Sequence, residues 1–591
     1  MIDHALTPRL RALTGSFLGA LFLVAASCAP AATPAPAPVA GPAPTVLATQ
    51  PSTPAPTAPA APRVPALTPI PTPLVTTPTP TPVGESPKAG GVLRFLLPGE
   101  APSKDPHTAL SPNAAMPFIY ETFLRQNPVT GAIEPLLVAR WEIPSETEVV
   151  LHVRPGVRFQ NRPPVNGRTM TAADVAYSLQ RIGTNDPRFF RRSQLVSVTK
   201  IEALDDSRVR VTFKEPFAPF LTYLADSYNE VVPKEAVEKF GNLEKVEDSI
   251  GTGPFVFERA TLGVGGSLKR NPDYWQKGKP YLDGAMWSVI PDAGTQVAAY
   301  RTTRLDMGAS FYGGVSGEFR NAIRRTNPAM QFYPVPDVRP NVLTMNVTRK
   351  PFDDIRVRKA IHLAVDRQEI IQIVMDGSAQ ISGPIGPRLF PFYAIPEAEL
   401  AKMPGFRPKD TPGGQQDIAE AKKLLAEAGY PNGLTIEADG SRYSYFTNLQ
   451  PMELAKNHLR KIGITVNITL LDQASYLAEE KRNFNFRARG FTTAVEVDAQ
   501  LSVRHSCAGS RNFTGFCDPD MEKLIAEQRR TLDPEKRKAI VLKAQYLLID
   551  KVPQVFLFEP NRYAVMQPWV RGAVPSANLP FGYVENVWFA K

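Results

Sequence analysis

A loop rich in arginine and aromatic residues lies in the last third of the chain, and its residue types suit ligand binding. The loop spans Glu437–Phe446 and contains Arg442, Tyr443 and Tyr445. A guanidinium can hold a carboxylate or phosphate through two parallel hydrogen bonds, and aromatic rings stack on flat groups. A surface loop with a solvated arginine would have the same composition, so the residue types alone leave both interpretations open.

The segments on either side of this loop predict a pair of parallel strands. Leu434–Ile436 has the character of a short strand, and Ile464–Leu470 alternates apolar and polar residues as a strand does. Between them, apolar residues repeat at helical spacing: Met452, Ala455, Leu459 and Ile462. The order strand, helix, strand implies a right-handed crossover. Ligands of open α/β sheets approach the carboxyl ends of strands, and the loop begins at such an end.

Capping residues locate several further helices. Thr171–Asp174 has the spacing of a capping box. Asp366–Glu369 and Asp417–Glu420 each predict a helix start, with stops at Gly377 and Gly429. Two more starts place proline directly after aspartate: Asp518-Pro519 and Asp533-Pro534. Together with the strands, these helices predict an α/β protein.

The composition excludes several classes of protein. The chain has 591 residues, 67 Lys+Arg, 57 Asp+Glu and 43% hydrophobic residues, which is typical of a soluble protein with two or more domains. Its net charge of +10 is spread along the chain without an aromatic-basic motif, which disfavours nucleic acid as a partner. The six histidines and three cysteines show no HExxH and no paired CxxC, so we expect neither a metal site nor a cofactor.

The first 27 residues have the pattern of a secretory signal. Basic residues precede an apolar stretch, 13–26, and Cys28 follows shortly after it. A cysteine at this place resembles the residue that becomes lipidated in bacterial lipoproteins, although Ala25 stands where leucine is preferred. An ordinary signal peptide with an incidental cysteine is the alternative. The Ala/Pro/Thr-rich remainder of residues 28–88 predicts an extended linker, because proline removes hydrogen-bond donors.

Cys507 and Cys517 bracket a short loop near the end of the chain. An exported chain enters an oxidising space, so we expect these two residues to form a disulfide. His505 is the nearby histidine, but no arrangement of a catalytic thiol is evident.

Five segments with characteristic residues follow one another from Gly90 to Ala590. They are Gly90–Arg94; Leu151–Phe159 with Asn166-Gly167 and Thr171–Val175; Gly251–Phe255 with Asn271–Trp275; Asn346–Arg367; and Gly463–Val466. In order and spacing they resemble the extracytoplasmic solute-binding proteins of peptide/nickel-type ABC importers, family 5. The resemblance implies a two-lobed periplasmic-binding-protein-like fold (type II, large cluster) with an extra subdomain in lobe I.

The resemblance also implies a domain organisation and a role. Lobe I would span 89–340 with the extra subdomain, lobe II 341–554, and a return segment, 555–591, would rejoin lobe I. Hinge closure of the two lobes around a solute would hide it from water, and the closed form would be recognised by the permease subunits. The resemblance thus implies a monomeric binding protein, not an enzyme, that is exported and lipid-anchored to the cell membrane, in the periplasm or at the cell surface.

Short-peptide binders of this family hold the peptide carboxylate with an arginine and the α-amino group with an aspartate. Counting back from Gly463, Arg442 takes the first role, but Ala494 stands where the aspartate belongs. This departure argues against simple dipeptides and leaves Glu496 and Asp498 as acidic candidates. The remaining residues that we predict to line the ligand site are Tyr443, Tyr445, Phe491, Thr492 and Tyr120, the last with a core position as its alternative.

Longer peptides, sugars, opines, other organic solutes and a metal chelate near His107 and His505 remain open as ligands. A receptor that feeds a sensor rather than a permease would have the same sequence features. An exported hydrolase is disfavoured, because no Gly-x-Ser-x-Gly or Ser-x-x-Lys stands in a strand-turn-helix setting.

Overall fold

The computed structural model describes residues 85–97, 99, 105–109, 116–308, 314–337, 339–441, 449–472, 475–476, 484–490, 496–577 and 581–591. All of them belong to one compact unit, 64–591. The predicted signal sequence, Cys28 and nearly all of the predicted linker lie outside the described residues. No helix in these ranges is both long enough and apolar enough to cross a bilayer.

Antiparallel strands predominate in the first part of the chain. Its elements are β1 (Val92–Leu97), α1 (Met116–Ile119), β2 (Leu124–Gln126), β3 (Ile133–Pro135), β4 (Val138–Ser145), β5 (Glu148–Val153), α2 (Ala172–Ile182), η1 (Phe190–Leu195), β6 (Val198–Ala203), β7 (Arg208–Phe213), α3 (Phe220–Tyr223), α4 (Lys234–Phe240), η2 (Val246–Asp248), β8 (Phe255–Thr261), β9 (Gly265–Arg270), β10 (Gly284–Val289), α5 (Ala293–Arg301), β11 (Met307–Gly308), α6 (Gly317–Thr326) and β12 (Gln331–Pro336).

Helices are more frequent in the second part. Its elements are β13 (Asn341–Met345), α7 (Ile355–Ala364), α8 (Arg367–Met375), β14 (Ala379–Ile381), α9 (Glu397–Leu400), α10 (Pro412–Glu427), β15 (Leu434–Ser441), α11 (Leu449–Arg460), β16 (Ile464–Leu471), β17 (Phe486–Gly490), α13 (Val497–His505), α14 (Pro519–Arg530), α15 (Pro534–Lys551), β18 (Gln554–Met566), β19 (Val570–Arg571), η3 (Val584–Asn586) and β20 (Trp588–Phe589).

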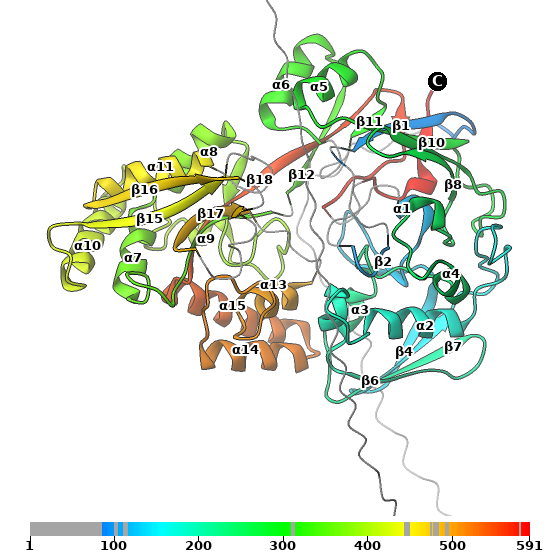
Figure 1. Ribbon diagram of the computed structural model, residues 1–591, viewed down its shortest axis with the longest axis horizontal. Helices are drawn as coiled ribbons and strands as arrows, with labels where there is room; N and C mark the ends of the chain where they lie inside the picture. Colours follow the sequence, from blue (N-terminus) through cyan, green and yellow to red (C-terminus); the bar gives the residue numbers. More distant parts are fainter. Residues whose placement is uncertain are drawn as a thin grey trace, which may run out of the picture. The chain divides into compact units, whose positions relative to one another are not determined.

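One long strand, β18, joins two groups of strands into a ten-stranded sheet (Figure 1). Its first residues, 554–558, pair antiparallel with β13, which in turn pairs with β17. Its last residues, 561–566, pair with β12, and β11 continues the sheet toward β1 and β10. The segment 554–558 is therefore the first part of a strand that belongs to both groups.

Buried apolar residues form separate cores for the two groups. The cluster that we call the first core includes Phe95, Phe118, Leu151 and Val211. Residues near the carboxyl end of the chain, within 566–587, also belong to it. The cluster that we call the second core includes Leu343, Ile361, Val466 and Val555. The first core thus draws on both ends of the described chain, while the lobe boundaries at 340 and 554 stay predictions.

The predicted strand, helix and strand around residues 434–470 are confirmed. β15 and β16 pair in parallel from Leu434 and Ile464 to Ser441 and Leu471, and α11 lies between them in sequence. The helix starts predicted at Thr171, Asp366, Asp518 and Asp533 are also confirmed, since each of these residues caps the helix that follows it.

The predicted start of a helix at Asp417 is wrong. α10 begins five residues earlier at Pro412, where the Thr411 hydroxyl caps the helix by accepting from the Gly414 N–H at 3.1 Å. Asp417 lies inside the helix and is buried. Its carboxylate accepts hydrogen bonds from Lys409 at 3.2 Å and from Arg407. An acidic residue that serves a tertiary ion pair was thus mistaken for a cap.

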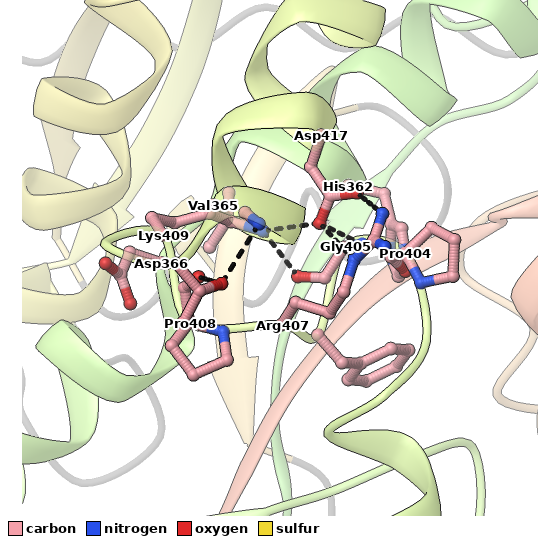
Figure 2. A network of polar contacts seen from close by, with 12 residues as sticks. His362, Val365, Asp366, Pro404, Gly405, Arg407, Pro408, Lys409 and Asp417 are labelled. Carbon is pink, nitrogen blue, oxygen red and sulfur yellow. Dashed lines mark hydrogen bonds and ion pairs between the residues drawn. The ribbon is translucent and has the colours of Figure 1, made fainter.

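Figure 2 shows the polar network that holds the segment 404–409 against α7, α8 and α10. Asp417 accepts from Lys409, Arg407 and the Gly405 N–H, the last at 2.9 Å. Gly405 has φ +86, and a Cβ there would meet His362 Nε2 at 2.2 Å. Burial and the positive charge of Arg367 lower the pKa of Lys409 to about 8. This network holds segment 404–409, which has little regular structure, against helices that pack into the second core.

Candidate functional site

Two strand ends of the second core lead into the segments predicted to bind ligand. β15 ends at Ser441, directly before Arg442, and β17 ends at Gly490, directly before Phe491. An ion pair between Arg487 of β17 and Asp439 of β15, 3.0 Å long, joins the strands close to these carboxyl ends. Arg442, Tyr443, Tyr445, Phe491 and Thr492 themselves lie outside the described residues.

Arg487 is the residue that fixes this strand junction, and it is not among the predicted site residues. Its side chain is fully buried, and its guanidinium lies 4.3 Å from the ring centres of both Tyr476 and Phe484. The charge is therefore held between two aromatic faces and one carboxylate, an arrangement that favours a fixed orientation. The alternation of apolar and charged residues in the short strand, Phe486–Arg489, is the signal that could have revealed Arg487.

Glu496 and Asp498, the two acidic candidates, stand at the start of α13 and are both buried. Glu496 pairs with Arg537 of α15 at 2.7 Å, and burial raises the pKa of its carboxyl despite this arginine. Asp498 pairs with Arg529 of α14 at 2.7 Å and accepts a hydrogen bond from Tyr223 at 2.9 Å. In the structure, both carboxylates thus hold α13 in place, and their ligand-binding role stays a prediction.

The bond from Tyr223 to Asp498 also connects the two groups of elements. Tyr223 belongs to the first core, whereas Asp498 begins a helix of the second part. Ala218 N–H donates to the Arg529 carbonyl at 2.8 Å, and Ala499 packs into the first core. α13 therefore contacts elements from both parts of the chain.

Tyr120 lies in the first core with an exposed fraction of 1%. A Cβ on Gly251 would come within 2.8 Å of its ring, so the ring packs directly against the Gly251–Phe255 segment. Burial raises the pKa of its hydroxyl. This placement matches the core position held open for Tyr120 as the alternative, and its contact with a ligand stays a prediction.

Glu121, the next residue, is not among the predicted site residues, and it connects the two parts of one characteristic segment, Gly251–Phe255 and Asn271–Trp275. Its carboxylate accepts from Thr252 at 2.8 Å, from the Tyr274 hydroxyl at 2.8 Å and from Trp275 Nε1 at 3.0 Å. Burial raises the pKa of Glu121 to about 7. A single acidic residue within Ile119–Phe123, a segment otherwise without charge, was the available signal.

The predicted disulfide between Cys507 and Cys517 is confirmed and closes the loop between α13 and α14. Within this loop, the Asn512 side chain donates to the carbonyls of Ser506 at 2.8 Å and Phe516 at 2.5 Å. The loop is thus braced from inside as well as by the bridge.

His107 and His505 are both buried, and burial lowers the pKa of each to about 3. His107 Nε2 lies 2.8 Å from the Glu230 carbonyl. Across the described part of the chain, no three His, Cys, Asp or Glu side chains gather as a metal site would require.

Comparisons with known proteins place these features in a family context. Residues 132–510 match the family model for bacterial extracellular solute-binding proteins, family 5 middle. The chain is 26% identical over 414 residues to a glutathione-binding protein, GsiB, of Salmonella typhi, covering 68% of this chain and 76% of that protein. It is 26% identical over 497 residues to heme-binding protein A of Haemophilus influenzae, covering 80% and 86%.

Among solved structures, the fold is similar to that of the periplasmic binding protein DppA from Helicobacter pylori in complex with the peptide STSA. The TM-score is 0.70 at 24% identity, and the match covers 85% of this chain and 99% of that one. The predicted two-lobed α/β fold is thereby confirmed.

Proposed function

Because the chain belongs to the bacterial extracellular solute-binding proteins, family 5, we propose that it captures a peptide or another small organic solute in an interlobe cleft and delivers it to the permease subunits of an ABC importer. The observation that carries this proposal is the family match over 132–510, which includes β17, α13 and the strand junction at Arg487. The named relatives are binding proteins, and we propose that this chain likewise releases its solute unaltered.

The remaining parts of the proposal concern attachment and assembly. Lipidation of Cys28 would anchor the protein to the cell membrane, and residues 29–88 would act as a spacer. A lipoprotein carries more than one acyl chain, which is enough for stable attachment. We propose a monomer that works in the periplasm or at the cell surface without a cofactor.

Native mass spectrometry of the chain from residue 85 onward, purified without denaturant, tests solute capture. We expect a fraction of the protein to retain a small organic molecule, because a closed binding site releases its solute slowly. The identified solute, added back at about 100 times its Kd, should stabilise the protein by about 2.7 kcal/mol in thermal or urea unfolding. Absence of any retained or stabilising solute, or release of a chemically altered one, would contradict the proposal.

Arg442 is proposed as the anchor for an anionic group of the solute, since it directly follows the carboxyl end of β15. The variant Arg442→Ala should bind such a solute more weakly by about 2–5 kcal/mol, because the anion would lose its charged partner. Isothermal titration calorimetry measures this difference. Arg460→Ala, at an exposed position of α11, is the matched control and should bind like the unchanged protein. Equal affinity of both variants would remove Arg442 from the site.

A further inference from the structure

Two neighbouring helices, α5 and α6, carry exposed arginines at the ends where they meet. The helices pack side by side on β1 and β18 through buried residues such as Tyr300 and Ile323 (Figure 1). At their carboxyl ends, the Asn327 side chain donates to the Arg301 carbonyl at 3.1 Å. Arg301 is the last residue of α5, and Asn327 directly follows α6. This bond ties the two helix ends together, so the arginines at these ends belong to one region of the surface.

Four arginines form this region, which we call the basic face: Arg301, Arg304, Arg324 and Arg325. All four are exposed. None of them forms an ion pair with an aspartate or glutamate among the residues that the structure describes. Their charges are therefore offset only by solvent and salt, and they are available to a partner outside the chain.

The acidic residues of the same stretch do not balance these arginines. Residues 293–330 include five arginines, no lysine and two acidic residues, Asp306 and Glu318. Asp306 is 1% exposed and pairs with Arg94 at 2.7 Å. Glu318 lies in the first turn of α6, at the opposite end of this helix from the basic face. The basic face thus has a net positive charge and attracts anionic surfaces.

Exposed apolar residues lie on the side of the sheet that carries these helices. Because side chains alternate along a strand, Val92 shares the face of β1 on which Leu96 joins the apolar cluster of α5 and α6. Arg94 stands opposite Met286 in the parallel pair of β1 and β10, which places Met286 on this face as well. Val92 is 42% exposed and Met286 is 39% exposed. Apolar side chains together with cations are the combination by which proteins bind to lipid surfaces.

The chain enters its folded part next to the basic face. Lys88 Nζ donates to the Lys591 carbonyl at 3.0 Å, and Lys591 Nζ lies 3.8 Å from the ring centre of Trp569. Trp569 Nε1 in turn donates to Asp306 at 3.0 Å, and Asp306 is two residues from Arg304. These contacts form a continuous path from the amino-terminal end of the described chain to the basic face.

The length of the predicted linker makes a separate orienting contact useful. Glu85, the first described residue, follows the predicted lipidation site Cys28 by 57 residues (85 − 28). A proline-rich chain spans about 3 Å per residue, so this linker would reach as far as about 170 Å. An anchor at that distance does not orient the folded part, whereas a charged face beside the point of entry does.

We propose that the basic face, together with Val92 and Met286, docks the folded part of the chain on an anionic lipid surface. The inference goes beyond solute capture: it rests on the proposed location at the membrane and not on the identity of the solute. A lipid surface is favoured over a second copy of this chain, because two copies of the same face would bring like charges together.

Vesicle flotation tests the docking with the chain from residue 29 onward, which keeps the whole compact unit, 64–591, and lacks Cys28. The vesicles contain either equal amounts of phosphatidylglycerol and phosphatidylcholine or phosphatidylcholine alone. We expect the protein to float with the anionic vesicles and not with the neutral ones. The partition constant should fall by about threefold or more between about 50 and 300 mM salt, because salt screens the attraction.

Two double variants remove the same charge at different places. Arg324→Gln with Arg325→Gln should weaken partition into the anionic vesicles about tenfold or more, because one cation near such a surface contributes about fivefold. Arg460→Gln with Lys461→Gln, an exposed pair at the end of α11, is the matched control and should bind like the unchanged protein. Circular dichroism and the melting temperature without vesicles confirm that each variant folds.

A third double variant, Arg301→Gln with Arg304→Gln, tests the basic face from the side of α5 and should weaken partition to a similar extent. Absence of flotation, equal flotation with both kinds of vesicle, or an equal loss in the control variant would overturn the docking surface. Tighter binding to polyglutamate than to the vesicles, lost in the same variants, would assign the basic face to an acidic protein partner and overturn the lipid proposal. Solute capture is independent of these outcomes, because native mass spectrometry tests it separately.

Discussion

Replacing Arg367 with alanine is expected to lower the free energy of unfolding by about 3–5 kcal/mol. The Arg367 side chain is fully buried; its Nε donates to the Phe556 carbonyl at 2.7 Å and its Nη1 to the Gly405 carbonyl at 2.5 Å. Its guanidinium also lies 4.4 Å from the ring centre of Phe406. Alanine would leave buried carbonyls without this donor and would create a cavity, and each effect costs one to several kcal/mol (about 1–3 for an unpaired group).

The effect of Arg367→Ala reaches beyond one contact because the side chain joins three segments. Phe556 belongs to β18, Gly405 to the network of Figure 2, and Arg367 itself begins α8. Urea denaturation followed by tryptophan fluorescence measures the loss as a shift of the transition midpoint. Arg140→Ala, which removes an exposed guanidinium paired with Glu142, is the matched control and should change stability by less than about 1 kcal/mol. Similar midpoints for both variants would contradict the role of Arg367.

The second large effect is a pH dependence that originates at Glu121. Its pKa is about 7 in the folded protein and 4.5 in its unperturbed state. The folded state therefore favours the protonated carboxyl, so its stabilising contribution is present below pH 4.5 and is lost as the pH rises through 7. Between pH 5 and 8, the loss amounts to about 2–3 kcal/mol for a shift of this size.

The variant Glu121→Gln should remove this part of the pH dependence, because an amide does not ionise. Unfolding by urea is measured at pH 5, 6, 7 and 8, and the difference between variant and unchanged protein isolates Glu121. This comparison is needed because burial also raises the pKa of Glu559 to about 7, and Glu559 adds a slope of its own. Glu238→Gln, at an exposed position of α4, should leave the slope unchanged. An identical slope in Glu121→Gln and the unchanged protein would show that Glu121 stays ionised in the fold.

Local features of this protein are determined by the sequence itself. The caps at Thr171, Asp366, Asp518 and Asp533, the parallel pair of β15 and β16, and the Cys507–Cys517 bridge all follow from residues close together in the chain. A helix cap acts on the next turn, and apolar periodicity repeats within one element, so short segments carry enough information to predict them. The five characteristic segments, which follow one another along the chain from Gly90 onward, were likewise sufficient to indicate the family.

The tertiary structure decided which polar residues act as partners of distant ones. Asp417 looked like a cap but pairs with Lys409, and Glu496 and Asp498 looked available but pair with Arg537 and Arg529. These choices depend on burial, because an ionised group that leaves water needs a partner wherever the fold places one. The bond from Tyr223 to Asp498 arises in the same way: 275 residues separate the two in sequence, and the packing of α13 against both parts of the chain brings them together.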